Sequence, residues 1–402
     1  MADFYHAGML TTLHRLGKPK PERLMAEVEL YSTLRPVALV LPALYSDVMG
    51  EAMKGIRQEL KAARFIKEIV LTLGPATDEE FSNVKRFMSE IPIEVKIVHT
   101  KGKRLQELYR SLEERGISAG PDGKGRSAWT AYGYVLASGK SNVIALHDCD
   151  IINYNLELLA RLIYPVITPT LEFTFCKGYY ARVTDKLHGR VTRLFVTPLI
   201  RALKRILSQQ PFLEFLDSFR YPLSGEFCMT TEVARINRVP WDWGLEVGML
   251  AEVYRNYSLK RICQVDITEN YEHKHQKLSA EDPSAGLMKM SIDIAKSLFR
   301  TLASEGIVFS EGFFKTLVSA YLRIAEDTIK RYESDAAING LTFDRHEEAM
   351  TVDAFTKSIT TASRAIMEDP LGAPLIPNWN RAISAIPGVL ERLKSAVEED
   401  NK

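Results

Sequence analysis

Residues 142–150 read Asn-Val-Ile-Ala-Leu-His-Asp-Cys-Asp, and this stretch decides the fold. The apolar run over 142–147 is typical of a strand buried inside a parallel sheet. Asp148 and Asp150 follow at its carboxyl end, where an α/β sheet opens its ligand crevice. A divalent cation held there by one or two carboxylates keeps positions open for phosphate oxygens, which favours a nucleotide-sugar transferase. A solvated loop is the alternative, because Asp-x-Asp is a common tripeptide.

The composition is that of a globular protein and excludes several function classes. The chain has 402 residues, of which 46% are hydrophobic and 26% charged, so a sizeable core is expected. Its 52 basic and 51 acidic residues nearly balance, whereas a nucleic-acid-binding protein would carry a basic excess. The four cysteines include no Cys-x-x-Cys pair, which argues against zinc and disulfides and fits a reducing cytoplasm. We expect no signal peptide and no membrane span, since the longest apolar run, 37–44, is far too short.

Short strands and helices alternate through the first two thirds of the chain. Strands are expected over 36–41, 65–73, 93–98, 142–147 and 262–267. Amphipathic helices are expected between several of them, one capped by Thr77 with Glu80 as its capping-box partner. This alternation predicts an α/β, doubly wound, Rossmann-like sheet that is mainly parallel.

The pattern divides the chain into three regions. Residues 1–35 are expected to form a helical lead-in. Residues 36–280 are expected to form the catalytic domain, with a nucleotide-binding half over 36–150 and an acceptor-binding half over 151–280. Strand patterns stop at about residue 280, so 281–402 are expected to be a helical C-terminal region.

The C-terminal region carries apolar stripes without clustered polar residues. Helices are expected over 345–368 and 380–398, with a break marked by Pro370, Pro374 and Pro377. We expect this region to brace the fold or to form a homodimer, because the stripe exceeds what the sheet needs. The residues at helical spacing are Phe314, Leu317, Tyr321, Ile324 and Thr328.

A glycine-lysine-glycine motif precedes the helix expected over 126–137. Gly123 and Gly125 flank Lys124, and such a helix start offers amide donors and an ammonium to a phosphate. The Walker spacing of a P-loop is missing. A surface turn with a solvated lysine is therefore the alternative.

Two further motifs place a carboxylate beside glycines, where a sugar hydroxyl has room to approach. They are Pro-Leu-Ser-Gly-Glu over 222–226 and Trp-Gly-Leu-Glu-Val-Gly over 243–248. Glu226 as a helix cap and Trp243 as a core residue are the alternatives. His273 and His275 follow the last expected strand and point to opposite faces if extended, so at most one can join a given metal.

Taken in order, these motifs resemble the glucosyl-3-phosphoglycerate synthases, which are retaining GT-A glycosyltransferases. The similarity covers roughly residues 36–305, and its specific parts are 222–226 and 244–248 with Gly-Arg-Val-Thr at 189–192 upstream. The resemblance implies a GT-A fold, an NDP-glucose donor, Mg²⁺ or Mn²⁺, and 3-phosphoglycerate as acceptor. The product would be glucosyl-3-phosphoglycerate, a precursor of a compatible solute.

The resemblance also implies residue roles. Asp150 and His273 would ligate the metal, with His275 as the alternative ligand, and Asp150, Glu246 and Lys124 would be catalytic. The acceptor's phosphate and carboxylate would be held by Gly189, Arg190 and Thr192, a fitting set for a small dianion. The residues implied in donor binding are Pro42, Ala43, Leu44, Lys124, Asp148, Leu223, Trp243 and Glu246.

The sequence departs from the family on the nucleobase side. The family has an acidic residue after Pro-Ala-Leu, whereas Tyr45-Ser46 follows here and Asp47 would substitute only with a shift. The second strand runs into Gly74-Pro75 rather than a serine-rich turn with an aspartate, and Trp243 stands where a tyrosine is usual. UDP, GDP and ADP donors therefore all stay open.

Several readings remain open at this point. A same-face route, in which the leaving diphosphate accepts the acceptor's proton, is favoured over double displacement on Glu246. Glycerate as acceptor or mannose in the donor would make the chain a glucosylglycerate or mannosyl-3-phosphoglycerate synthase. A non-catalytic sugar-nucleotide binder is a further alternative. A phosphohydrolase with Asp148 as nucleophile is disfavoured, because its Asp-x-Asp would follow the first strand.

Overall fold

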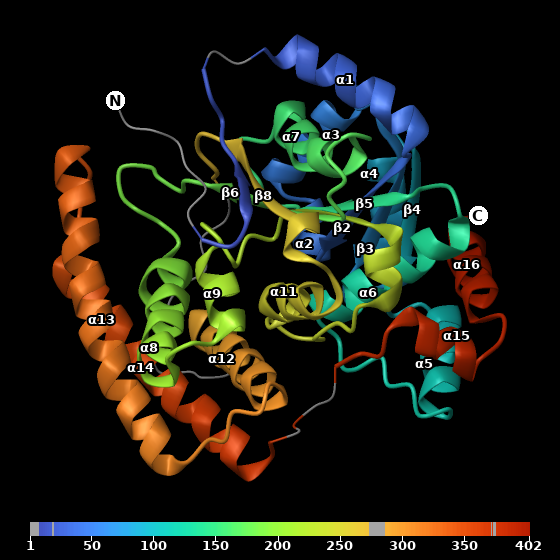
Figure 1. Cartoon of the computed structure of the whole chain (residues 1–402). Coiled ribbons are helices and arrows are strands. Elements are labelled where there is room, and N and C mark those ends of the chain that lie inside the picture. The colour runs from blue at the N-terminus through green and yellow to red at the C-terminus, as the bar shows by residue number, and fades with distance from the viewer. Residues whose placement is uncertain (1–7, 18–19, 273–285, 371, 373–374) are drawn as a thin grey trace.

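The computed structural model describes residues 8–17, 20–272, 286–370, 372 and 375–402, and a single sheet lies at its centre (Figure 1). The strands are β1 (Thr11–Leu13), β2 (Val37–Ala43), β3 (Ile66–Leu73), β4 (Glu94–His99), β5 (Val143–Leu146), β6 (Phe175–Tyr180), β7 (Phe227–Thr230) and β8 (Ile262–Thr268). Within the described residues their order is β1-β8-β6-β7-β5-β2-β3-β4. Every pairing is parallel except those of β7, which runs antiparallel to β5 and β6.

Helices cover both faces of the sheet. The first half contributes α1 (Pro21–Leu34), α2 (Tyr45–Val48), α3 (Glu51–Leu60), α4 (Asp78–Met88), α5 (Lys103–Glu113), α6 (Lys124–Ser138) and α7 (Leu156–Ile167). The middle contributes the π-helix η1 (Val191–Val196), α8 (Thr197–Leu207), α9 (Pro211–Asp217), α10 (Thr231–Ile236), α11 (Leu245–Asn256) and the short 3₁₀ helix η2 (Leu259–Arg261). The C-terminal part contributes α12 (Gly286–Ser304), α13 (Glu311–Ile338), α14 (Arg345–Glu368), α15 (Trp379–Ala385) and α16 (Val389–Asp400).

Strand β2 shows why the sheet is buried on both sides. Val37, Leu39 and Leu41 belong to one hydrophobic cluster, while Ala38 and Val40 belong to the other. Successive side chains of a strand point to opposite faces, so a continuous apolar run needs helices on both. Helices α1, α3, α4 and α7 complete the first cluster, and α5, α6 and the helices from α8 onward complete the second.

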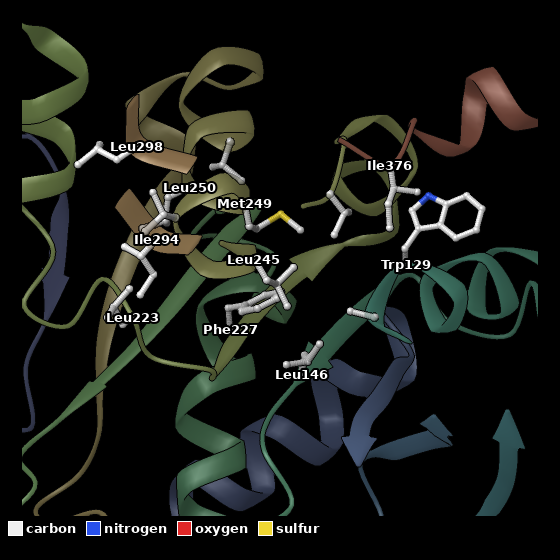
Figure 2. Packing of buried hydrophobic residues seen from close by; sticks show 14 of the residues in the cluster. Trp129, Leu146, Leu223, Phe227, Leu245, Met249, Leu250, Ile294, Leu298 and Ile376 are labelled. Atoms are coloured by element: carbon white, nitrogen blue, oxygen red, sulfur yellow. The ribbon is translucent and has the colours of Figure 1, made fainter. Parts of the chain in front are cut away.

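The C-terminal region packs onto the second face rather than standing apart. Figure 2 shows Leu245 and Met249 of α11 close to Phe227 of β7, with Ile294 of α12 beside them. The two tryptophans Trp129 and Trp379 stack at 4.0 Å between ring centroids, which fastens α15 to α6. In Figure 1, α13 and α14 form the left edge of the molecule, on the opposite side from β4 and α16.

The doubly wound, mainly parallel sheet is confirmed, but two details of the prediction were wrong. Residues 1–35 are not purely helical, because β1 lies before α1 and adds a parallel edge strand beside β8. The single helix expected over 380–398 is two helices, α15 and α16, separated at Ile386–Gly388 where Gly388 has φ 79°. Strands β6 and β7 were not predicted at all.

The apolar stripe of α13 packs against other helices of the same chain. Phe314, Leu317 and Tyr321 are buried, and the Tyr321 hydroxyl donates to the carbonyl oxygen of Leu194 at 2.7 Å. The stripe packs against α8 and η1, so it no longer argues for a dimer. In the part of the chain that the structure describes, no helix is long and apolar enough to cross a membrane.

Candidate active site

A cavity of about 780 Å³ opens at the carboxyl ends of β2, β5 and β6. Its position is the one expected for a ligand crevice in a doubly wound sheet. It brings together the predicted site residues on described parts of the chain. Those residues are Pro42, Ala43, Leu44, Lys124, Asp148, Asp150, Gly189, Arg190, Thr192, Leu223, Trp243 and Glu246.

Lys124 is the central cation of one side of this cavity. Its Nζ lies 2.7 Å from Asp148 Oδ1 and 3.0 Å from Glu246 Oε1. Burial opposes the charged form, but the two carboxylates outweigh it and raise the pKa of Lys124 well above its ordinary value. Lys124 therefore carries a permanent positive charge at the first turn of α6, where backbone amides add to it.

The glycines of the motifs serve close packing around this cation. A Cβ on Gly123 would lie 2.2 Å from the Trp241 carbonyl oxygen, and one on Gly125 would lie 1.7 Å from that of Pro240. A Cβ on Gly225 would lie 2.5 Å from Asp148 Oδ2. We expected phosphate or sugar to fill the space at these glycines; the structure fills it with neighbouring backbone and with the Asp148 carboxylate.

His147 supports the turn that carries Asp148 and Asp150. Its Nδ1 lies 2.9 Å from the Asp148 carbonyl oxygen and its Nε2 lies 3.2 Å from the Tyr154 hydroxyl. Because a carbonyl oxygen can only accept, Nδ1 carries the proton and Nε2 accepts from Tyr154. Burial lowers the pKa of His147 to about 4, so the ring is neutral at pH 7.

Glu226 is fully buried behind the cavity wall, where it contacts the lining residues Tyr180 and Tyr271. It accepts hydrogen bonds from the hydroxyls of Tyr180 at 2.6 Å, of Ser224 at 3.0 Å, and of Tyr271. Burial and then the nearby Asp148 raise the pKa of Glu226. The two tyrosine rings stack at 3.9 Å between centroids, so Glu226 ties the ends of β6 and β8 together and caps no helix.

Two buried oxygens in the cavity have no hydrogen-bond partner among the described residues. They are Glu246 Oε2, next to Lys124, and Thr192 Oγ1, at the start of η1. A buried polar atom without a partner is costly, and such atoms cluster where a ligand supplies the partner. Glu246 and Thr192 lie on opposite halves of the predicted site, one for the donor and one for the acceptor.

The residues predicted to bind the acceptor lie on the loop before η1 and in its first turn. Gly189 has φ 74°, a conformation that favours glycine, and Arg190 begins the helix that holds Thr192. Arg190 pairs with Glu347 and Glu348 of α14. The expectation that no polar residues cluster in the C-terminal region was therefore wrong, since these glutamates reach the cavity wall.

Of the two predicted metal ligands, only Asp150 belongs to the described residues. Asp150 lines the cavity beside Asp148, whereas His273 and its alternative His275 lie outside the described residues. The chain before His273 is held near Asp150, because Glu272 donates its N–H to Asn153 Oδ1 at 3.0 Å and accepts from Ile152 N at 2.8 Å. The described residues contain no cluster of three or more metal-binding side chains, so a metal here needs a ligand from beyond them or from the substrate.

Sequence reasoning missed several cavity residues. Helix α12 contributes Leu287, Lys289 and Met290, and Asp47, whose role in donor binding stays a prediction, also lines the wall. The basic run from Arg182 to Arg193 was a visible pattern that was not used. Besides the predicted Arg190, it brings Arg182, Lys186 and His188 to the cavity.

Comparison with known proteins gives a consistent answer. No family model matches the chain. The protein named glucosyl-3-phosphoglycerate synthase from Persephonella marina is 53% identical over 100% of this chain and 99% of its own length. Its namesake from Methanococcoides burtonii is 38% identical over 100% of this chain and 98% of its own length.

Solved structures support the same fold. Glucosyl-3-phosphoglycerate synthase from Mycobacterium tuberculosis in complex with phosphoglyceric acid has a TM-score of 0.53 at 20% identity, covering 75% of this chain and 90% of that one. The same enzyme with Mn²⁺, UDP-glucose and phosphoglyceric acid has a TM-score of 0.52 at 23% identity, covering 75% and 89%. At this identity the likeness establishes the fold.

Proposed function

The chain belongs to the glucosyl-3-phosphoglycerate synthase family, and on that premise we propose that it transfers glucose from an NDP-glucose to the 2-hydroxyl of 3-phosphoglycerate with retention at the anomeric carbon. One observation carries the proposal. One cavity holds the partly buried cation Lys124 and Glu246 Oε2 on one side, and Arg190 and Thr192 Oγ1 on the other, and neither oxygen has a hydrogen-bond partner among the described residues. The two halves suit a diphosphate sugar and a small dianion.

The donor half suits a metal-bound diphosphate. We propose Asp150 and His273 as the protein ligands of Mg²⁺ or Mn²⁺, the ions bound with UDP or UDP-glucose in the mycobacterial enzyme. The carboxylate chemistry fits a hard cation, which would supply charge to neutralise the departing diphosphate. Lys124, fixed by Asp148, holds an ammonium at the same place. UDP-glucose is the first donor to test.

The acceptor half suits 3-phosphoglycerate. Arg190 can form paired charge-assisted hydrogen bonds to phosphate, while the Gly189 backbone and Thr192 Oγ1 offer further donors. Glycerate lacks the phosphate that these donors would bind. This contrast favours the phosphorylated acceptor.

The reaction needs positioning more than acid-base chemistry. The bond from C1 of glucose to the diphosphate breaks while C1 bonds to the acceptor's 2-oxygen, and the acceptor's proton passes to the departing diphosphate. Lys124 stabilises the charge that develops there. Glu246 Oε2 is placed to accept from a sugar hydroxyl, and its pairing with Lys124 makes Glu246 a poor nucleophile, which favours the same-face route.

A donor-by-acceptor matrix with Mg²⁺ tests the proposal. We expect turnover with a glucose nucleotide and 3-phosphoglycerate, and an α-linked product by proton NMR if the donor is α-linked. Arg190→Ala should raise KM for 3-phosphoglycerate at least about 30-fold, because the phosphate loses a charged partner, while the donor KM stays within twofold. Preference of the native protein for glycerate, or equal movement of both constants, would contradict the acceptor assignment.

The oligomeric state is a separate matter. A homodimer stays a prediction, without support from the apolar stripe of α13, because that stripe is buried inside the chain. Light scattering at micromolar concentration tests it, and a monomer mass would remove it.

A further inference from the structure

The loop that carries Gly189 and Arg190 is held from outside the sheet. We propose that the α13–α14 hairpin is a working part of the acceptor site, in which Glu348 is a positioning residue for Arg190 and Glu347 is the counter-ion that the acceptor's phosphate displaces. The inference rests on the proposed function and assigns a duty to the C-terminal region. It predicts that Glu348 strengthens acceptor binding and that Glu347 weakens it.

Glu348 is a buried carboxylate shared by two arginines. Its side chain is 5% exposed, and its Oε1 accepts from Arg190 Nε at 2.9 Å. Its Oε2 accepts from Arg193 Nη1 at 2.8 Å. A buried ion pair with this geometry fixes both guanidinium planes, because the carboxylate has acceptor positions for both and no water competes.

Arg193 extends this anchor to the backbone of the acceptor loop. Its Nε donates to the His188 carbonyl oxygen at 2.8 Å and its Nη2 to that of Leu187 at 3.3 Å. Its guanidinium also lies 4.7 Å from the ring centroid of Tyr332 in α13. Glu348, through Arg193, therefore holds the two residues that precede Gly189.

The turn between α13 and α14 adds a backbone link. The N–H of Thr342 donates to the Asp185 carbonyl oxygen at 2.8 Å, and Lys186 and Thr342 form a parallel bridge. The loop is thus fastened to the hairpin at both of its ends, near Asp185 and near Arg190. A segment fastened in this way enters the acceptor complex with less ordering left to do.

Glu347 differs from Glu348 in its surroundings. Its side chain is 52% exposed, and its Oε1 lies 2.8 Å from Arg190 Nη2. An exposed ion pair contributes little to stability. It does occupy an edge of the guanidinium that a phosphate would use, and its negative charge opposes an incoming dianion. Binding of the acceptor then requires Glu347 to give way, while Glu348 keeps its hold on Nε.

Four single substitutions separate these duties. Glu348→Gln removes the charge that faces both arginines, so KM for 3-phosphoglycerate should rise about 10-fold while kcat and the donor KM stay within twofold. Glu347→Gln should lower KM for 3-phosphoglycerate about threefold, because the competing charge is gone. Glu333→Gln breaks the exposed pair with Arg345 across the same two helices, at 3.2 Å, and should change neither constant. Glu348→Asp, which keeps the charge, should recover part of the lost acceptor binding.

Each outcome decides the inference. If Arg190→Ala raises the acceptor KM while Glu348→Gln and Glu347→Gln leave it unchanged, the proposed function stands and the inference fails. If Glu348→Gln lowers kcat and the unfolding midpoint and raises the KM values of both substrates, Glu348 is structural only and the inference also fails. Glu347 is exposed, so Glu347→Gln remains folded and still reports on the counter-ion. If Arg190→Ala moves nothing, the acceptor assignment itself is wrong.

Discussion

The proposed donor and acceptor halves of the cavity are built in different ways. On the donor side, Lys124 is enclosed by Asp148 and Glu246, and the glycines at 123, 125 and 225 let backbone and carboxylate close around it. On the acceptor side, long side chains meet, as Arg190 and Arg193 reach Glu348 of a helix from the C-terminal region. Both halves contain ion pairs, but the first sets them within closely packed backbone, whereas the second takes its carboxylate from a helix of the C-terminal region.

The difference in construction fits the proposed task of each half. Charge develops on the departing diphosphate, and fixed charges stabilise it without reorganisation at the moment of reaction. The acceptor has to enter and leave, and an arginine with one buried and one exposed carboxylate can keep its place while it exchanges a partner. A rigid half and an adjustable half therefore share one cavity.

Metal removal should give the largest effect and should fall on the donor half. We expect EDTA treatment or Asp150→Ala to lower turnover about 10³-fold or more, because the diphosphate loses most of its neutralising charge. Binding of 3-phosphoglycerate, measured by calorimetry, should survive Asp150→Ala. Adding back Mg²⁺ or Mn²⁺ should restore the chelated native enzyme. Full turnover in EDTA would show that the donor half needs no divalent cation, which would contradict the contrast between the two halves.

Lys124→Met should come next in size. It removes the donor-side cation and leaves the buried Glu246 and the partly exposed Asp148 without their counter-charge, so kcat/KM for the donor should fall about 100-fold or more. The free energy of unfolding should drop about 3–5 kcal/mol. The matched control is Lys101→Met, which breaks an exposed pair with Asp122 at 2.5 Å and should cost little. Equal effects of the two substitutions would show that Lys124 is an ordinary surface charge.

The pH dependence of stability should distinguish the two halves. Burial sets the pKa of His147 at about 4, below the 6.5 of the unfolded chain, so the unfolded state binds more protons between these values. The stabilisation is fully present above pH 6.5 and is lost as the pH falls toward 4, with a total of about 3 kcal/mol. Arg190 stays charged throughout, because its glutamates raise its pKa against the effect of burial.

Chemical unfolding at a series of pH values measures this effect. The native protein and His147→Asn are compared, since the asparagine amide can donate to the Asp148 carbonyl but does not titrate. The difference between the two stability curves should slope between pH 6.5 and 4 and be flat above it. A flat difference over the whole range would mean that His147 is not buried as described.

Among these four predictions, Thr192→Val should give the smallest change. It should stabilise the protein while weakening acceptor binding. Valine has nearly the shape of threonine and removes a buried hydroxyl that has no partner among the described residues, so stability should rise about 1 kcal/mol. KM for 3-phosphoglycerate should rise about 10-fold, because the bound acceptor loses a hydrogen bond to a charged group. Thermal unfolding and acceptor kinetics measure the two. A loss of stability would show that Thr192 Oγ1 is already satisfied in the protein.

The sequence by itself determined five of the described strands and the place of the site. The apolar runs over 36–41, 65–73, 93–98 and 142–147 became β2, β3, β4 and β5, because hydrophobic periodicity is local information. Parallel strands bring their carboxyl ends to one edge, so Asp148, Asp150 and Pro42–Leu44 had to meet. Strand β7 escaped prediction because its residues, only four, stand between a glycine motif and a helix.

The tertiary structure alone decided which charges meet. Nothing in the pattern around Glu347 and Glu348 says that they face Arg190, because an ion pair between residues 158 apart depends on how α14 packs. The glycine motifs predicted space for a ligand, but in the tertiary structure Pro240, Trp241 and the Asp148 carboxylate occupy that space. Periodicity fixes which face of an element is buried, but it does not fix the partner that the face finds. That partner is set by the packing of the whole chain.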